Sequence, residues 1–115
     1  MCLDFNKMKD EMKQTLGREL EPELRTQAAE RLYQILALID KPEDMADFLR
    51  DLLTLEEIEE ASSRFLIASA LKKGTKSIRE IAKEFGVSTT TVVRINYWLH
   101  HGMGGYDLAL KKLKS

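Results

Sequence analysis

The sequence predicts an all-α protein, with five to seven helices and no sheet, and three observations lead to this prediction. Apolar residues recur at spacings of three and four over most of the 115 residues, which is the period of an amphipathic helix. No stretch alternates apolar and polar residues in the manner of a half-buried strand. The stretch from Ser77 to Ile95, SIREIAKEFGVSTTTVVRI, has the spacing of a helix-turn-helix, in which two short helices meet across a tight turn.

The local chemistry of this stretch supports the motif at each boundary. Ser77 and Glu80 form a capping box, in which the hydroxyl accepts from the Glu80 amide and the carboxylate reaches back. Gly86 supplies the positive φ that a sharp turn requires, and Ser88 caps the second helix. The apolar side chains expected to face inward are Ile81, Ala82, Phe85, Val87, Val92 and Ile95.

The motif predicts binding to double-stranded DNA, with residues 88–97 as a recognition helix in the major groove. Threonine hydroxyls can donate or accept at base edges, methyl groups can meet a thymine methyl, and arginines can hold phosphates. The predicted DNA-binding residues are Ser77, Arg79, Ser88, Thr89, Thr90, Thr91, Val93, Arg94 and Tyr97. The plainer alternative is an ordinary helical hairpin whose threonines are only solvated.

The charge distribution favours a polyanion as the partner. The formal net charge is −1, but residues 1–71 hold nine Lys and Arg against sixteen Asp and Glu, whereas residues 72–115 hold nine against three. The positive part contains the helix-turn-helix. Stretches of like charge are often only solvated surface, yet their coincidence with the motif favours a role in binding.

The composition predicts a cytoplasmic protein without a membrane segment. Cys2 is the only cysteine, so an intramolecular disulfide is excluded and a reducing compartment is natural. The first twenty residues alternate charges with Met and Leu and lack the apolar core of a signal peptide. No run approaches the roughly 20 apolar residues that span a bilayer.

One domain, residues 21–115, is expected to follow a leader of residues 1–20. Pro22 is suited to the first turn of the next helix, whose broad apolar stripe runs to Ile39. A stripe this wide favours burial against several neighbours, including another subunit. The leader has an amphipathic helical spacing that fits a dimer-packing arm or a mobile element, through Phe5, Met8, Met12 and Leu16.

Two further helices are expected before the motif. Pro42 lies at the start of the first, and a second capping box of Thr54 and Glu57 begins the other. Lys72, Lys73 and Gly74 favour the end of that longer helix. Its inward side chains are expected to be Ile58, Ala61, Phe65, Leu66, Ala68 and Leu71, and a short final helix is expected over residues 106–113.

The order of these elements resembles the Trp repressor superfamily. The resemblance rests on LLTLEEIEEASSRFLIASAL before the motif, with Leu-Thr-x-x-Glu from Leu53 and with Arg64, and on GGYDLAL, which Trp-repressor-like bacterial proteins share. It covers residues 26–114. The resemblance implies an all-helical, intertwined homodimer with interlocked amino-terminal helices and two reading heads related by symmetry. This docking geometry is taken over from the family.

The resemblance also implies a site for a small-molecule effector. In the Trp repressor, tryptophan lies between the core and the recognition helix, held by two arginines that correspond to Arg64 and Arg94 and by a threonine that corresponds to Thr54. Ile95 and Trp98 stand where the repressor has a glycine and a serine, and both add bulk where the indole lies. We therefore expect a repressor that binds DNA without tryptophan. The alternatives are a regulator that senses another small molecule and a module that binds protein.

Enzymatic activity, a metal and a cofactor are not expected. No Ser or Cys stands in a recognisable nucleophile pattern, and no glycine-rich loop suits a phosphate. His100 and His101 are adjacent, which directs them to different sides of a helix. No clustered carboxylate or further cysteine completes a metal-binding set with them.

Overall fold

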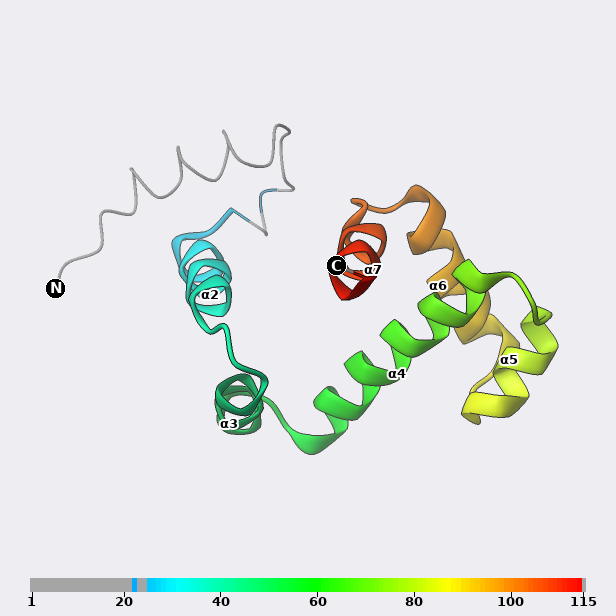
Figure 1. Cartoon of the computed structure of the whole chain (residues 1–115), viewed down its shortest axis with the longest axis horizontal. Helices are drawn as coiled ribbons and strands as arrows, with labels where there is room; N and C mark the ends of the chain where they lie inside the picture. The colour runs from blue at the N-terminus through cyan, green and yellow to red at the C-terminus, as the bar shows by residue number, and fades with distance from the viewer. Residues whose placement is uncertain (1–21, 23–24, 115) are drawn as a thin grey trace, which may run out of the picture. The chain divides into compact units, whose positions relative to one another are not determined.

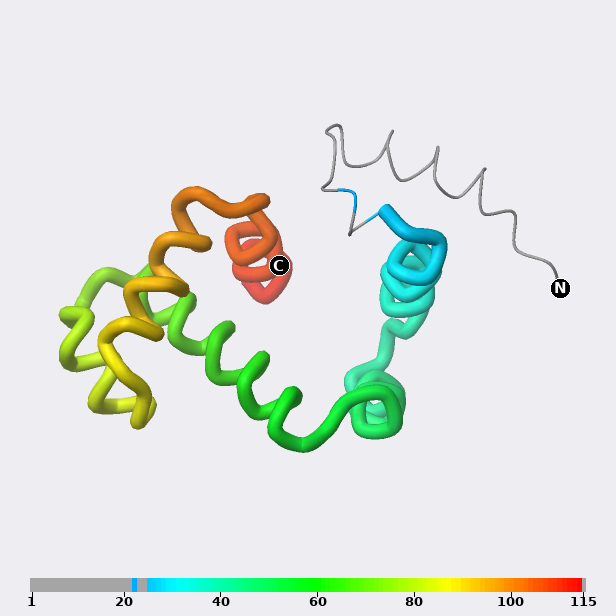
Figure 2. Tube along the Cα trace, turned by 180° about the vertical axis from the view of Figure 1, so that it is seen from behind, coloured from blue at the N-terminus to red at the C-terminus, as the bar shows by residue number. Residues whose placement is uncertain are grey.

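Helices are the regular secondary structure of the part that the structure describes, which is Pro22 and residues 25–114 of a computed structural model (Figures 1 and 2). No strand occurs among these residues, so the predicted all-α class is confirmed. The leader helix expected in residues 1–20 lies outside the described residues. The helices are α2 (Gln27–Leu38), α3 (Pro42–Leu52), α4 (Leu55–Lys73), α5 (Ile78–Phe85), α6 (Thr89–His101) and α7 (Gly105–Lys114).

The chain divides into two compact units, residues 1–52 and residues 53–115. The first contains α2 and α3, and none of the hydrophobic side chains of these two helices is fully buried. Leu38 is 74% exposed and Leu52 is 47% exposed. The second unit contains the other four helices and a closed hydrophobic core. The separation of residues 1–20 from residues 21–115 stays a prediction.

The start of α2 differs from the sequence prediction. Pro22 was expected in the first turn, but the helix begins at Gln27. Thr26 takes the N-cap position, where its Oγ1 accepts from the Ala29 N–H at 3.1 Å. The physical reason is that a threonine in extended backbone satisfies a free amide of the first turn, which Pro22 has no side-chain group to do.

In the second unit, α4, α5 and α6 meet around a small core. Ile67, Ile81 and Val92, one from each helix, are fully enclosed. Ala68 and Ala82 are buried beside them, and their small side chains permit a close approach of the helices. All six inward positions predicted for the motif are confirmed: Ile81, Ala82, Val92 and Ile95 are buried, and Phe85 and Val87 pack half-buried against them.

The predicted inward face of α4 is partly wrong. Ala68 is buried, but Leu66 is 53% exposed, Ala61 is exposed and Ile67 is buried instead. Successive residues of a helix are rotated by about 100°. Since Ile67 and Ala68 both turn toward α5 and α6, Leu66 is left on the outside of the core.

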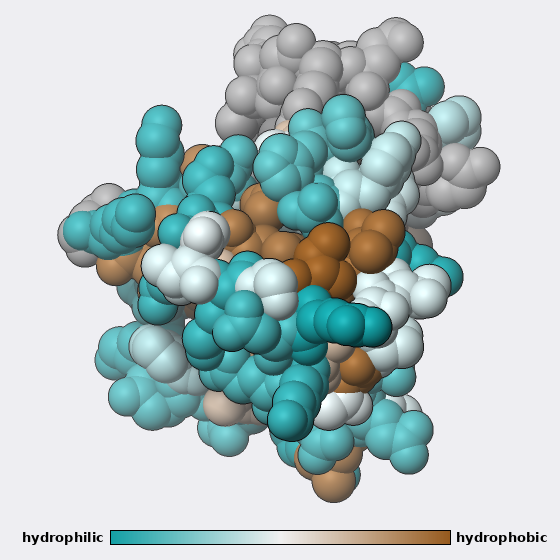
Figure 3. Space-filling view, turned by 90° about the vertical axis from the view of Figure 1, so that its right-hand side faces the viewer, coloured by the Kyte–Doolittle hydropathy of each residue, from teal (hydrophilic) through white to brown (hydrophobic). Residues whose placement is uncertain are grey.

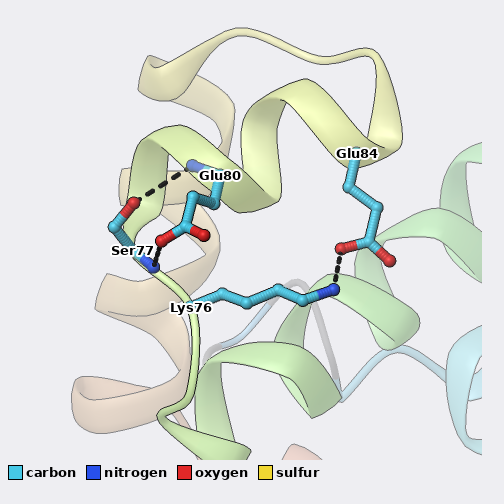
Figure 4. A network of polar contacts seen from close by, with 4 residues as sticks. All are labelled: Lys76, Ser77, Glu80 and Glu84. Atoms are coloured by element: carbon cyan, nitrogen blue, oxygen red, sulfur yellow. Dashed lines mark hydrogen bonds and ion pairs between the residues drawn. The ribbon is translucent and has the colours of Figure 1, made fainter.

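Reciprocal hydrogen bonds fix the first turn of α5 (Figure 4). The Glu80 N–H donates to Ser77 Oγ at 3.2 Å, and the Ser77 N–H donates to Glu80 Oε1 at 3.0 Å. Lys76 and Glu84 form an ion pair alongside, which joins the segment before the helix to its last turn. The predicted capping box is confirmed, and the corresponding box of Thr54 and Glu57 begins α4.

We expect the second unit to lose stability in acid because of these two boxes. The backbone N–H of Ser77 and then its hydroxyl lower the pKa of Glu80 below its ordinary 4.5, and Thr54 lowers the pKa of Glu57 in the same way. The folded pKa lies below the unfolded one, so the stabilisation is complete above the unfolded value and is lost as pH falls through the folded value. Urea unfolding at a series of pH values, with Glu57→Gln/Glu80→Gln beside the parent chain, measures this.

The double variant should show a weaker loss of stability over that acid range than the parent chain. Glu59→Gln is the matched control, because Glu59 is an exposed glutamate of α4 that caps no helix. It should keep the full acid dependence. Equal acid dependence in the parent chain and the double variant would contradict the prediction.

Candidate nucleic-acid interface

A tight turn sets the angle between α5 and α6, which pack against the C-terminal half of α4 (Figure 1). Gly86 ends α5 with φ of 66°, a left-handed conformation that glycine adopts at little cost. Its N–H donates to Lys83 O at 3.3 Å, and the Val87 N–H donates to Ala82 O at 3.0 Å. This pair of bonds is the Schellman arrangement. The predicted glycine turn is therefore confirmed.

Two hydroxyls close the N-terminus of α6. Ser88 Oγ accepts from the Thr91 N–H at 3.1 Å and also lies 3.0 Å from Thr91 Oγ1. The predicted cap at Ser88 is confirmed. Both side chains were also predicted to bind DNA. In the structure their hydroxyl groups lie within hydrogen-bonding distance of each other in the cap.

The side chains of α6 divide into a buried and an exposed face. Val92, Ile95 and Leu99 are buried. On the opposite side, at spacings of three and four, lie Thr90, Val93, Arg94 and Tyr97, all exposed. We call these four residues the outward stripe. Val93 is 51% exposed and Tyr97 is 57% exposed, and the exposed Thr89 lies at the side of the stripe.

The surroundings of the outward stripe suit a negatively charged partner. Residues 85–106, which include all of α6, contain no Asp or Glu. Arg79 is exposed in the first turn of α5. The surface seen from the side of α5 is mainly hydrophilic (Figure 3). The structure thus exposes eight of the nine predicted DNA-binding residues and leaves Thr91 half-buried, and their contact with DNA stays a prediction.

Rings gather at the C-terminal end of α6. Tyr97 meets Trp98 edge-on at 5.9 Å between ring centroids and meets His101 at 5.0 Å. His100 instead places Nδ1 2.9 Å from Asn96 O. The two histidines therefore have separate surroundings. Among the described residues, no group of three or more His, Cys, Asp or Glu is placed to hold a metal.

A pocket of about 480 Å³ lies between α4 and α6, next to the outward stripe. Four of the five residues expected at an effector site line it: Arg64, Arg94, Ile95 and Trp98. Ile95 is 4% exposed and belongs to the core, whereas Trp98 is 50% exposed. The other lining residues are Glu60, Ser63, Ile67, Val87, Thr91 and Tyr106.

The fifth expected residue, Thr54, does not line this pocket. It is the N-cap of α4, and its Oγ1 accepts from the Glu57 N–H at 3.1 Å. Arg64 lies ten residues, about 2.8 turns, further along the same helix. Within the second unit, Thr54 is therefore a helix-capping residue.

Sequence reasoning assigned none of the six other lining residues of the pocket to an effector site, and Glu60 and Tyr106 differ in whether a local signal existed. Glu60 lies one turn before Arg64 and approaches it at 3.9 Å, and this i, i+4 spacing was readable from the sequence. The pair is exposed, so it contributes little to stability. Tyr106 had no such local signal. It reaches the pocket because α7 returns to α4, where Lys72 Nζ lies 3.2 Å from Asp107 Oδ1.

Residues 27–114 match the family model described as Trp repressor protein. The chain belongs to the Trp repressor family. The uncharacterized protein YerC of Bacillus subtilis is 30% identical over 91 residues, which cover 79% of this chain and 86% of YerC. A Trp operon repressor homolog of Xylella fastidiosa is 39% identical over 70 residues, 61% of this chain and 76% of the homolog. A crystal structure of a TrpR-like protein from Eubacterium eligens has 34% identity and a TM-score of 0.76, covering 82% of this chain and 96% of that one.

Membership of the Trp repressor family confirms the resemblance and associates the chain with DNA-binding transcription regulators. The arrangement of α5 and α6 as a helix-turn-helix is consistent with a family of DNA-binding regulators. None of the described helices is long and apolar enough to cross a membrane.

The turn after α6 holds Trp98 closely, and we predict that it does not tolerate a side chain. A Cβ at Gly102 would lie 2.3 Å from Trp98 O and 3.1 Å from Trp98 Cε3. Gly102→Ala should therefore lower the free energy of unfolding by about 1–3 kcal/mol, the usual cost of overpacking. Urea unfolding followed by circular dichroism and by the fluorescence of Trp98, the only tryptophan, measures the change.

Gly105→Ala is the matched control, since a Cβ at Gly105 meets no atom within 4 Å. Gly105 is the first residue of α7, where alanine should leave the stability unchanged or raise it by up to about 1 kcal/mol. Equal stability of the two variants would show that the turn after α6 yields to the added methyl group.

Proposed function

We propose that this chain is a transcriptional repressor that binds double-stranded DNA as a homodimer, with α6 of each copy in the major groove. The observation that carries the proposal is the exposure of the outward stripe. It is exposed because Val92 and Ile95, on the other side of α6, are buried against α4 and α5. The N-terminal part of a recognition helix contacts base edges. Here that part presents Thr89, Thr90 and Val93, and α6 itself contains no acidic side chain.

The exposed side chains fall into one group suited to contact bases and another suited to contact phosphates. Thr90 lies on the outward stripe in the first turn of α6, where a hydroxyl and a methyl group can meet a base pair. Arg79 lies on α5, the helix that crosses the backbone in this motif, so its role is to bind phosphate. Arg94 lies later on the stripe and also lines the pocket. A molecule or side chain that fills the pocket would therefore affect the position from which Arg94 contacts DNA.

The exposed apolar side chains support a dimer. Leu55 and Leu66 on α4 are 57% and 53% exposed, and Leu108 and Leu113 on α7 are 60% and 71% exposed. None of the hydrophobic side chains of α2 or α3 is fully buried. A second copy that covers these surfaces would complete the core of a small chain. The two symmetry-related recognition helices would then require DNA half-sites whose centres lie about 34 Å apart or at a multiple of that distance.

The experiment that tests the proposed function combines genome-wide footprinting with a measurement of affinity against salt. A dimer that neutralises several phosphates should bind a near-palindromic site with an affinity that falls steeply as salt is raised. Equilibrium sedimentation should give two chains per particle, free and on DNA. Salt-independent binding, or a stable monomer at micromolar concentration, would contradict the proposal.

Thr90→Ala and Arg79→Ala should have different effects on DNA binding. Thr90→Ala should relax discrimination at one base position by about 1–3 kcal/mol. Arg79→Ala should weaken binding to all sequences about equally and reduce the salt slope by about one. Both residues are exposed, so each variant should fold as the parent chain does. Uniform losses of affinity in both variants would make the assignment of base and phosphate contacts wrong.

We further propose that DNA binding does not require tryptophan. Ile95 and Trp98 are larger than the glycine and serine of the related repressor, and both line the pocket beside Arg94. Covalently attached side chains would hold the recognition helix in place of a diffusible ligand. The binding-competent conformation would then be populated without an effector.

Millimolar tryptophan should therefore change neither the operator affinity nor the melting temperature. Both quantities are measured with and without the ligand, because a ligand that binds only the folded chain raises the melting temperature. A clear rise in either would contradict tryptophan independence.

The second candidate function is a regulator that senses another small molecule. The observation in its favour is that the pocket keeps about 480 Å³ between two arginines, Arg64 and Arg94. The same titrations with a panel of small carboxylates test it, since guanidinium groups bind carboxylates. A rise in melting temperature with one of them would favour this candidate over an effector-independent repressor.

A further inference from the structure

The turn before α6 and the first five residues of α6 carry an unusual set of side chains for a recognition helix. Residues 85–93, FGVSTTTVV, include no Arg, Lys, Asn, Gln, Asp or Glu. Arg and Lys read guanine, Asn and Gln read adenine, and Glu and Asp accept from cytosine. Hydrogen-bonded readout of these bases by the usual residue types is therefore not open to residues 85–93, and Arg94 is the first side chain of α6 that could supply it.

The cap removes part of the remaining hydrogen-bonding capacity. Ser88 Oγ accepts from the Thr91 N–H and lies 3.0 Å from Thr91 Oγ1, so these hydroxyls are engaged at the helix end. The exposed residues left among the first five residues of α6 are Thr89, Thr90 and Val93, and the exposed Arg94 follows directly after them. Each of the first three presents at least one methyl group on a β-branched side chain.

Val93 is an apolar residue in an exposed position on α6. It is 51% exposed in the middle of the outward stripe, three residues after Thr90 and four before Tyr97. One exposed valine on a surface is ordinary. Here, however, it lies where a recognition helix meets base edges, and its branched side chain has one strongly preferred rotamer in a helix. Its methyl groups are thus held in a fixed position at little cost in conformational entropy.

We propose that this chain recognises its operator half-sites through the C5-methyl groups of thymine, one of which packs against Val93 and a second against the methyl group of Thr90. This inference rests on the proposed function and specifies the class of DNA that α6 selects. Thymine is the base that presents a methyl group in the major groove, and apolar contact is how that group is read. A G·C pair at either position offers no such group.

The test is to replace thymines of the footprinted operator by uracil, one pair of symmetric positions at a time. Uracil keeps every hydrogen-bonding group of thymine and lacks only the C5-methyl group. The full-length chain should lose affinity by about fourfold per half-site at one or two positions, the amount expected for burial of one methyl group. Thymines outside the footprint should be replaceable without effect.

A double-mutant cycle then assigns one position to Val93. Val93→Ala should make one uracil substitution neutral, because the variant has lost the methyl groups that contacted that thymine. Arg79→Ala is the matched control: it should weaken binding to both operators while the ratio of their affinities stays that of the parent chain. Val93 is half exposed, so the melting temperature of Val93→Ala should remain near that of the parent chain.

The outcomes separate this inference from the function beneath it. Sequence-specific binding that tolerates uracil at every position would overturn methyl readout and leave the proposed function intact. A uracil effect that persists unchanged in Val93→Ala would overturn the assignment to Val93. Failure to bind any DNA specifically would overturn both proposals.

Discussion

The packing of α6 against α4 and α5 determines the direction in which every outward side chain of α6 points. Val92 and Ile95 share one buried cluster with residues of the other two helices, among them Ala68 and Ala82. These alanines allow the helices to approach closely, and in such a core an extra methylene group is felt. Because a helix has a fixed rotation per residue, burial of Val92 and Ile95 exposes Thr90, Val93 and Tyr97. The geometry of the candidate DNA surface is therefore a consequence of the core.

The hydroxyl groups of residues 88–91 serve two different purposes. Ser88 and Thr91 face each other across the first turn and satisfy the helix end, which would otherwise leave amides without partners. Thr89 and Thr90 are exposed and take no part in that cap. A run of one serine and three threonines thus contains both structural and surface residues.

The pocket between α4 and α6 lies between the buried core and the outward stripe. Ile95 belongs to the buried cluster, Arg94 to the outward stripe, and both line the pocket. Trp98 lies one turn after Arg94, and a Cβ added at Gly102 would lie 3.1 Å from Trp98 Cε3. Any molecule that entered the pocket would contact both a residue of the buried core and a residue of the outward stripe. Such a position is suited to setting the orientation of the helix, whether attached side chains or a ligand fill it.

The sequence by itself determined the features whose causes lie within one or two helical turns. The capping boxes of Ser77 and Thr54, the left-handed Gly86 and the buried face of the motif follow from local hydrogen bonding and helical period. Membership of the family could be predicted from the sequence for the same reason, because the sequence pattern of the family is a series of such local features. Only the tertiary structure decided that Ile67 rather than Leu66 is buried, and that Tyr106 joins the pocket while Thr54 does not. Burial and lining depend on which neighbouring helix covers a face, and that choice is made by contacts between segments far apart in the chain.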